Sequence, residues 1–448
     1  MVDALPLDAR AVAATAALAA LPGVLVVRSP WRAMPLLSLA FWMASWTWPL
    51  GGSRTRVLHV SLAAFATLAL FRVLRPGPLP RAGRAQLLIV LAAILVAMPQ
   101  ARPGVPSGAE APVDALAAEL LAWHDGWPAS FEPLSPQRPF EAGGLAAIAA
   151  DVVLLSGAPV HRALLAVNVV AEVMLLLALW SLAATRTSPG RAAIVAAVGL
   201  LPAALAEGSG VLASAFAVEA AALWRDRRGH PSAFTAGACV AAGMMTDITT
   251  ACGALILATL LARMGPDLAG ARSSHPPAAG RLRTAAGTAL VLALPLTWRI
   301  PRIEPPDAAS LAAVALTGVL AVLAVRPARD EWRIVACGLV LVAAGTALLG
   351  RARDAGLTRD EEAAMIWIRD HSHALARVCA PDVPAARWIP ALAARATTVA
   401  LRPGGPRPDG ACGVRISLSG LLPPGVGASD PPAFRAGRAA VWTTSQAR

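Results

Sequence analysis

Long apolar runs recur along most of the chain, and short polar segments containing Arg, Pro or Gly separate them. A helix needs about 20 apolar residues to cross the hydrocarbon layer of a bilayer, with about 17 as a lower limit. Several runs are shorter, so these spans must extend into flanking residues or be broken helices. The pattern predicts about twelve transmembrane helices, at residues 10–27, 33–50, 57–71, 85–99, 163–182, 192–206, 211–224, 232–246, 249–263, 284–298, 309–325 and 334–350.

Two stretches depart from the membrane pattern. Residues 100–145 are rich in Pro, Gly and charge, but they contain an amphipathic piece, Val113 to Trp123, that we expect to lie as a helix along the outer surface. The other stretch is 358–448, where Thr358 and Glu361 form a capping box that begins a helix. This helix should end near His371, and further elements should follow it: a strand at Ala376 to Ala380, a helix at Pro384 to Arg395, and strands near Thr397 to Leu401, Val414 to Leu418 and Ala439 to Thr443.

These elements define the expected fold class, an all-α polytopic membrane protein with a small C-terminal α/β domain. Residues 1–99 would form the N-terminal transmembrane helices, and 100–162 an external loop with surface helices and the candidate active site. Residues 163–350 would form a transmembrane bundle, and 351–448 the small external domain.

Composition agrees with a membrane protein. The chain is 56% apolar and 15% charged, against roughly 45–50% and about 25% in average soluble domains, and its mean hydropathy is +0.60. All 39 basic residues are Arg, against 27 acidic residues, which gives a net charge of +12. Such a charge can indicate nucleic-acid binding, but the arginines lie in short clusters between apolar runs, which is the pattern of membrane topology signals. We therefore expect no nucleic-acid partner.

The arginine clusters also predict an orientation. If residues 100–145 are external, the internal connections carry 18 arginines and the external ones before the tail carry 8, in agreement with the positive-inside rule. The tail then lies outside the cytoplasm, provided that an even number of spans separates it from the loop. The absence of Lys and the abundance of Ala, Arg, Gly and Pro are typical of a high-GC bacterial genome, so the expected location is a bacterial inner membrane.

The external loop carries the candidate chemistry. Carboxylates at the mouth of a membrane cavity suit a transferase that acts on a lipid-linked donor, because a carboxylate can take a proton from an acceptor hydroxyl or hold a divalent ion against a phosphate. Glu110 and Asp114 are the candidates. The simpler alternative is that both are solvated loop charges.

A family resemblance rests on the order of these segments. Glu110 is followed by the expected surface helix, a Gly-x-Pro turn, a Pro-rich stretch that ends in Phe140, and a second helix before Gly-x-Pro-x-His161-Arg162. The tail adds Ala363-Ala364-Met365-Ile366-Trp367-Ile368-Arg369, then Arg387-Trp388-Ile389-Pro390 and Arg395. This order resembles the GT-C superfamily of integral-membrane glycosyltransferases, especially bacterial members of the protein mannosyltransferase and aminoarabinose transferase type.

The resemblance implies a polyprenyl-phosphate sugar donor, an external lipid, polysaccharide or protein acceptor, and inversion at the anomeric carbon. Glu110 or Asp114 would be the catalytic base or would hold a metal ion, and a divalent metal is the one cofactor that this chemistry suggests. Such families usually carry Asp where this chain has Glu110. Because Glu places the carboxylate one methylene further out, the chain is either an enzyme with a shifted acid or a relative that has lost catalysis.

Four further residues have two interpretations each. Arg138 and Arg162 would grip a donor phosphate through paired N–H groups or would contact lipid headgroups. His124, with Asp125, would shuttle a proton or would pack beside Trp123 and Trp127. Asp247 would be a second site carboxylate or part of an external turn.

Two alternatives to the enzyme remain: a non-catalytic scaffold, and a transporter or flippase of a lipid-linked substrate. The transporter hypothesis rests on three acids within predicted helices, Glu172, Glu219 and Asp247, because acids in hydrocarbon must face a cavity or a partner. A further hypothesis concerns the tail, where Cys379 and Cys412 would form a disulfide if the compartment is oxidising.

Overall fold

The structure is a computed structural model, and it describes residues 8–26, 34–46, 53–74, 106, 110–124, 126, 130–136, 143–184, 208–225, 230–247, 251, 255, 357–401, 411–423, 425–427 and 430–443. The predicted spans at 85–99, 192–206, 284–298, 309–325 and 334–350 lie outside these residues, as does nearly all of 249–263.

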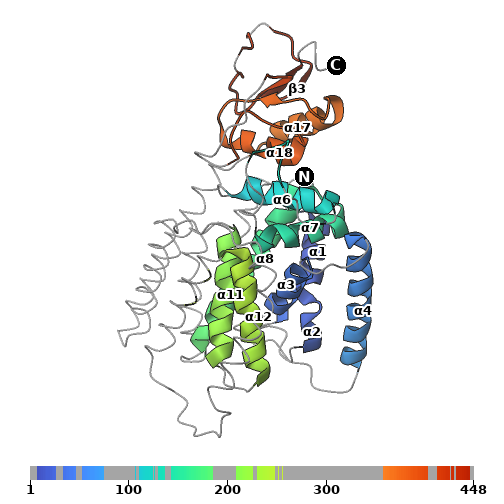
Figure 1. Ribbon diagram of the computed structural model, residues 1–448, viewed down its shortest axis with the longest axis vertical. Coiled ribbons are helices and arrows are strands. Elements are labelled where there is room, and N and C mark those ends of the chain that lie inside the picture. The colour runs from blue at the N-terminus through green and yellow to red at the C-terminus, as the bar shows by residue number, and fades with distance from the viewer. Residues whose placement is uncertain are drawn as a thin grey trace, which may run out of the picture.

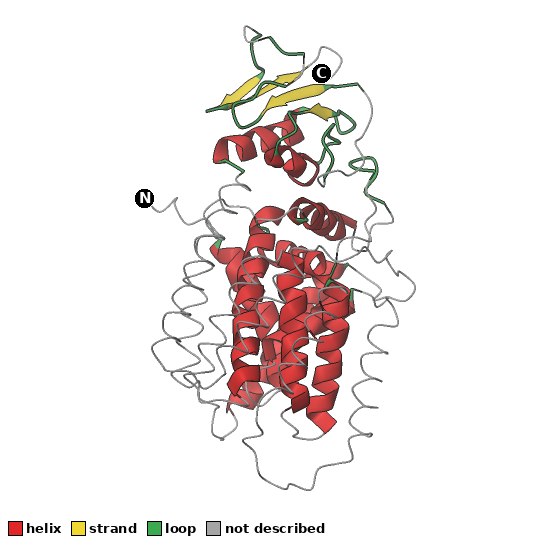
Figure 2. Ribbon diagram, turned by 90° about the vertical axis from the view of Figure 1, so that its left-hand side faces the viewer, coloured by secondary structure: helices red, strands yellow, loops and turns green. Residues whose placement is uncertain are grey.

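The described part has a bundle of long helices, a helix that lies across one end of it, and a small domain with a sheet beyond that helix (Figures 1 and 2). The crossing helix is α6. The helices before the domain are α1 Ala9–Ala20, α2 Gly23–Val26, α3 Met34–Ser45, α4 Arg54–Leu74, α6 Ala111–His124, α7 Gly144–Ser156, α8 Val160–Ala184, α11 Gly208–Arg225 and α12 His230–Thr246.

Two described helices, α4 and α8, are long and apolar enough to cross a membrane by length and composition. They differ in their surroundings. Two thirds of the apolar window of α8 is buried, whereas only 11% of that of α4 is buried, and α4 stands at the edge of the molecule (Figure 1). The predicted first span is divided at Leu21 and Pro22 into α1 and α2.

Close backbone contact joins the start of α7 to the end of α12. A Cβ atom at Gly143 would overlap the carbonyl oxygen of Thr246, and a Cβ at Gly144 would overlap the sulfur of Met43 in α3. Only glycine lets three helices meet this closely at one point, which explains the Gly-Gly pair before an apolar run.

The C-terminal domain combines helix α17, Arg359–His371, with 3₁₀-helix η3, Pro384–Trp388, and helix α18, Ile389–Ala393. Its sheet has the order β1-β2-β4-β3, formed by β1 Val378–Cys379, β2 Val414–Ser417, β3 Phe434–Ala436 and β4 Ala439–Thr443. β1 pairs with β2 in parallel, and the other two pairings are antiparallel. The predicted small α/β domain is therefore confirmed in outline.

The predicted capping box is present, and it reaches beyond its own helix. The Glu361 carboxylate accepts hydrogen bonds from the backbone N–H of Thr358 at 2.8 Å and, through its other oxygen, from the N–H of Ser419 at 2.6 Å. Glu361 is buried, so the side chain that begins α17 also fixes the chain after β2 against this helix.

The side chain of Arg395 caps the C-terminus of the same helix. Its guanidinium donates to the carbonyl oxygens of Arg369 and Ser372, at 2.8 and 2.6 Å, and these carbonyls lie at the C-terminus of α17. A cation at this end also interacts favourably with the helix dipole. Burial lowers the pKa of Arg395 from its ordinary value. Arg395 therefore has a structural role in the described domain.

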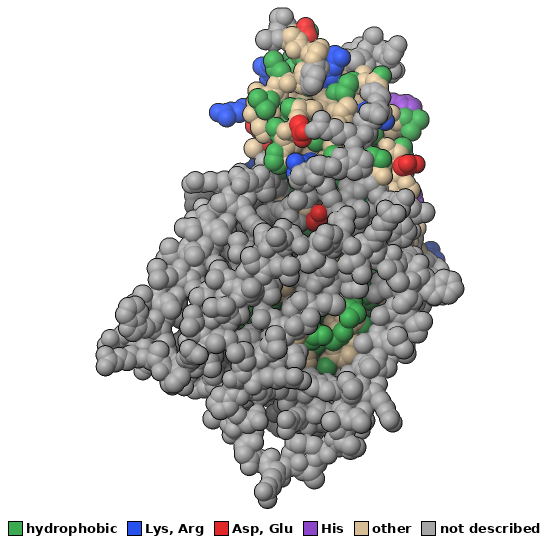
Figure 3. All heavy atoms as spheres, turned by 60° about the vertical axis from the view of Figure 1, so that its left-hand side comes forward, with side chains coloured by type: hydrophobic (Ala, Val, Ile, Leu, Met, Phe, Trp, Pro, Cys, Tyr) green, Lys and Arg blue, Asp and Glu red, His purple; other side chains and the backbone are tan. Residues whose placement is uncertain are grey.

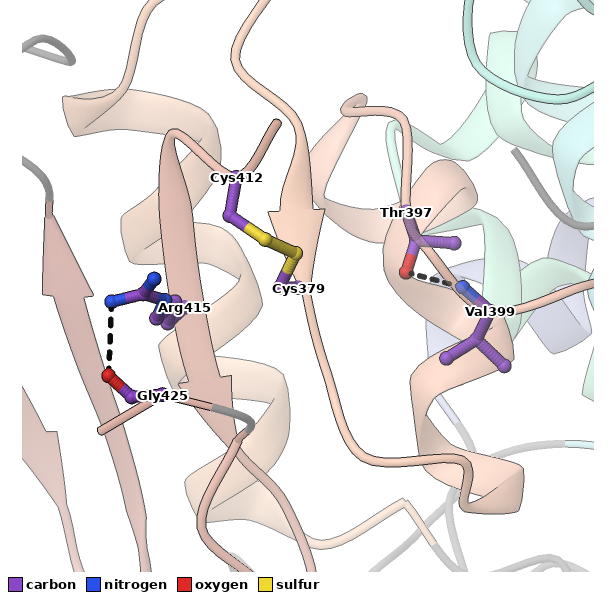
Figure 4. Close-up of a disulfide and its surroundings, with 6 residues drawn as sticks. All are labelled: Cys379, Thr397, Val399, Cys412, Arg415 and Gly425. Carbon is purple, nitrogen blue, oxygen red and sulfur yellow. Dashed lines mark hydrogen bonds between the residues drawn. A yellow bond between two sulfur atoms is a disulfide. The ribbon is translucent and has the colours of Figure 1, made fainter. Parts of the chain in front are cut away.

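A disulfide joins the edge strand β1 to the segment that leads into its parallel neighbour β2. Cys379 ends β1, Cys412 lies two residues before β2, and their Cα atoms are 5.6 Å apart (Figure 4). The disulfide hypothesis is thereby confirmed in the structure.

Candidate functional site

The candidate acids lie at the start of α6. Glu110 directly precedes the helix, and its carbonyl accepts hydrogen bonds from the N–H groups of Val113 and Asp114 at 2.9 and 3.0 Å. Asp114 is four residues further on, in the first turn of the helix. Glu110 is half-buried and Asp114 is 4% exposed. Negative charge at a helix N-terminus is also stabilising in itself, so this placement gives the acids a structural reason to be there.

The position of α6 differs from the prediction. The prediction of a helix is confirmed, but α6 does not lie on an open surface: it packs against α7 and α8 on one side and against η3 and α18 on the other (Figures 1 and 2). Ten of its 14 residues are buried, because α7 and α8 cover one side of the helix and the C-terminal domain covers the other. The acids therefore begin an enclosed helix between two parts of the protein.

The structure separates His124 from the acids. His124 ends α6, and because a helix rises 1.5 Å per residue it lies roughly 21 Å from Glu110. His124 is exposed, and the Trp123 side chain is 52% exposed. His124 therefore lies apart from Glu110, whereas Asp125 and Trp127, which the two interpretations of His124 include, lie outside the described residues.

Arg162 takes part in a charged cluster at the junction with the C-terminal domain. Glu362, on α17, lies 3.1 Å from His161 Nε2 and 3.4 Å from Arg162 Nη2. His161 Nε2 is also 3.1 Å from Arg162 Nε. One ring nitrogen cannot donate to Glu362 and accept from Arg162 at once, and the charged carboxylate is the stronger acceptor, so we assign the N–H of His161 to Glu362. The hydrogen bond from His161 and the nearby Arg162 lower the pKa of Glu362.

A second carboxylate faces the same domain. Glu119, midway along α6, is partly buried, and burial raises its pKa to about 7 although the positive charge of Arg369 on α17 opposes the shift. Glu119 and the cluster of His161, Arg162 and Glu362 together place charged groups along the junction between the helical part and the C-terminal domain.

The two remaining predicted residues have different outcomes. Arg138 lies outside the described residues. Asp247 follows the last residue of α12 and is half-buried, and its carbonyl accepts a hydrogen bond from Ala251 N at 2.9 Å. Both interpretations of the Asp247 side chain therefore stay predictions.

The sequence interpretation missed a buried ion pair. Arg54, at the start of α4, donates from Nε and Nη2 to the two oxygens of Asp151 in α7, at 3.0 and 2.8 Å. Both side chains are almost fully buried. Arg54 also donates to Ser45 Oγ at 2.8 Å and lies over the ring of Trp46. Asp151, an acid within an apolar run, was the one available signal, because such an acid needs a partner.

Two more acids lie inside the helical part. Glu172 on α8 is 6% exposed and Glu219 on α11 is 1% exposed, and these two helices pack extensively against each other. Both acids are therefore enclosed by protein. Within the described residues, no group of three or more His, Cys, Asp or Glu is arranged to hold a metal ion.

Comparison with protein-family models, with curated proteins and with solved structures finds no match to this chain.

Proposed function

We propose that the chain is a bacterial inner-membrane glycosyltransferase that moves a sugar from a polyprenyl-phosphate donor to an acceptor outside the cytoplasm. The proposal rests on the GT-C-like order of segments and on one structural observation: the helix that begins with Glu110 and Asp114 lies between apolar helices and a covering domain. In this proposal one of the two carboxylates acts as general base toward the acceptor hydroxyl.

The exposed face of α4 supports embedding in a bilayer. α4 has 21 residues, or roughly 31 Å of helix, which matches the hydrocarbon thickness. Its outward side chains include Val60 at 69% and Phe71 at 63% exposure. Soluble proteins rarely expose an apolar surface of this length, whereas lipid tails cover it without cost.

The disulfide and the surface of the C-terminal domain support a location outside the cytoplasm. Disulfides persist in oxidising compartments, and Cys379 and Cys412 are joined. Acidic and basic side chains are both spread over this domain (Figure 3), as expected for a surface that meets water.

The direct test is transfer of radiolabelled sugar by membranes that contain the chain, with polyprenyl-phosphate sugars as donors. We expect Glu110→Gln or Asp114→Asn to lower the rate at least 100-fold if the residue is the base, because general-base catalysis typically contributes 10²–10⁴-fold. Glu132→Gln is the matched control, because Glu132 is an exposed carboxylate outside α6 and its loss should leave transfer unchanged.

Wild-type membranes that transfer no sugar from any polyprenyl-phosphate donor would exclude the enzyme. Wild-type rates of transfer by both Glu110→Gln and Asp114→Asn would exclude these residues as the base, but the chain would still be a glycosyltransferase. The two results therefore separate a wrong function from a wrong residue.

A transporter of a lipid-linked substrate is the second candidate, and the burial of Glu172 and Glu219 on the packed helices α8 and α11 favours it. Reconstituted vesicles distinguish the two functions. The transporter would be favoured if a labelled polyprenyl-phosphate sugar moves between the leaflets and no sugar is transferred. Glu219→Gln should abolish this movement.

A further inference from the structure

We propose that the cavity beside Arg377 binds a phosphate group. The inference stands apart from the proposed sugar transfer, because neither Glu110 nor Asp114 lines this cavity. Pro133 and Leu134 line it from the loop after α6, and Ala374, Leu375, Arg377 and Ala396 line it from the C-terminal domain.

The volume of the cavity limits the size of the ligand. It measures about 70 Å³, which is more than the roughly 10–15 Å³ that one water needs and far less than the roughly 300–1,000 Å³ of ordinary small-molecule pockets. The cavity therefore suits one small charged group, with any attached chain leaving through the opening.

The backbone of Arg377 is fixed, but one nitrogen of its guanidinium, Nη1, has no acceptor among the described residues. The carbonyl of Arg377 accepts hydrogen bonds from the N–H groups of Gly413 and Val414 at 3.0 and 3.1 Å, which anchors the residue beside β1. Its Nη1 atom is buried, and among the residues that the structure describes it has no hydrogen-bond partner. A buried N–H donor without an acceptor is costly, so we assign the missing acceptor of Nη1 to a bound ligand.

Phosphate matches this environment best. A guanidinium presents paired N–H donors that fit the oxygens of a phosphate. The remaining lining is apolar, which favours a phosphate that carries an apolar substituent over a fully hydrated anion. Glu132, the acidic residue next to the lining, is exposed, and among the described residues Arg377 forms no ion pair that would compete.

The test uses the full chain purified in a neutral detergent, with isothermal titration calorimetry against inorganic phosphate, dioctanoyl phosphatidate and acetate. We expect wild type to bind phosphate and Arg377→Gln to weaken this binding at least tenfold. Arg435→Gln is the control: Arg435 is an exposed arginine on β3 of the same domain, so the affinity of this variant should stay within twofold of wild type. Binding of phosphatidate alone assigns the site to a lipid phosphate, and binding of inorganic phosphate assigns it to the free ion.

A second variant tests the cavity rather than the charge. Ala396→Leu should fill the space and weaken phosphate binding to a similar extent, and thermal unfolding curves show whether each variant remains folded. Three results would each overturn the proposal: equal binding by wild type and a folded Arg377→Gln, equal affinity for acetate, or binding of neither inorganic phosphate nor phosphatidate by wild type. If the wild-type chain binds phosphate but transfers no sugar, the proposed function is overturned and the phosphate site stands.

Discussion

At the scale of single residues, the charged side chains show where sequence reasoning succeeds and where it stops. The capping box of Thr358 and Glu361 could be predicted because its two members are three residues apart and act on one helix end. The pair of Arg54 and Asp151 could not, because the partners are 97 positions apart and only the packing of α4 against α7 brings them together. Local patterns carry no information about such pairs.

The Arg54 pair has a definite energetic signature. Asp151→Leu leaves a buried guanidinium without its counter-charge, and we expect a loss of about 3–5 kcal/mol in the free energy of unfolding. The double variant Arg54→Met with Asp151→Leu removes both charges, so it should lose much less. Denaturant unfolding of the detergent-solubilised chain measures both, and equal losses would show that the pair is not coupled.

Glu119 should make stability depend on pH. Its pKa is about 7 when folded, against an ordinary value of 4.5, so the folded chain holds this proton more tightly than the unfolded chain does. Stability from this group is therefore greatest at low pH and falls as pH rises from about 4.5 to about 7. We expect Tm to fall by roughly 2–4 °C between pH 5 and pH 8 through this group. Glu119→Gln should lack that part of the fall, and an identical pH profile in the variant would count against the assignment.

At the scale of elements, helices and strands differ in how far the sequence predicts them. α17 and β4 have nearly the predicted ends, and the predicted helix at 384–395 is divided into η3 and α18. The predicted strand at 397–401 is reduced to one bridge between Val378 and Thr397, because β propensity alone provides no partner strand. β3 was missed because it has only three residues, although Gly437, with a positive φ of 50°, marks the turn between β3 and β4.

The disulfide should stabilise the parallel pair of strands. Cys379 and Cys412 are 33 residues apart, and in the chain-entropy description closure of such a loop stabilises by about 3–4 kcal/mol. Cys412→Ser should therefore lower the stability of the C-terminal domain by about this amount, and a reductant should do the same to wild type. Mass analysis without reductant checks the bond itself, since two free thiols at these positions would remove the prediction.

At the scale of the whole molecule, the contacts between the helical part and the C-terminal domain could not be predicted from the sequence. The helix over 113–123 was predicted from its period, but its burial depends on α18 and η3, which come more than 250 residues later. For the same reason Arg162 was interpreted as a phosphate or lipid ligand, whereas the structure places it against Glu362.

Loss of the Glu362 contacts should loosen this junction. Glu362→Gln removes the negative charge that His161 and Arg162 face, and a hydrogen bond to a charged group contributes about 1.5–3 kcal/mol. We expect faster amide hydrogen exchange in α6 and α17 without global unfolding. Asp370→Asn is the matched control, since Asp370 pairs with Arg369 on the exposed face of α17, and its exchange pattern should equal that of wild type.

The enclosure of α6 also sets an order of events during biosynthesis. At about 5–20 residues per second, roughly 13–50 s separate the emergence of α6 from that of α18. Throughout that interval the side of α6 that α18 and η3 later cover lacks these neighbours. Until the last hundred residues have folded, the helical part therefore carries one helix whose cover has yet to be made.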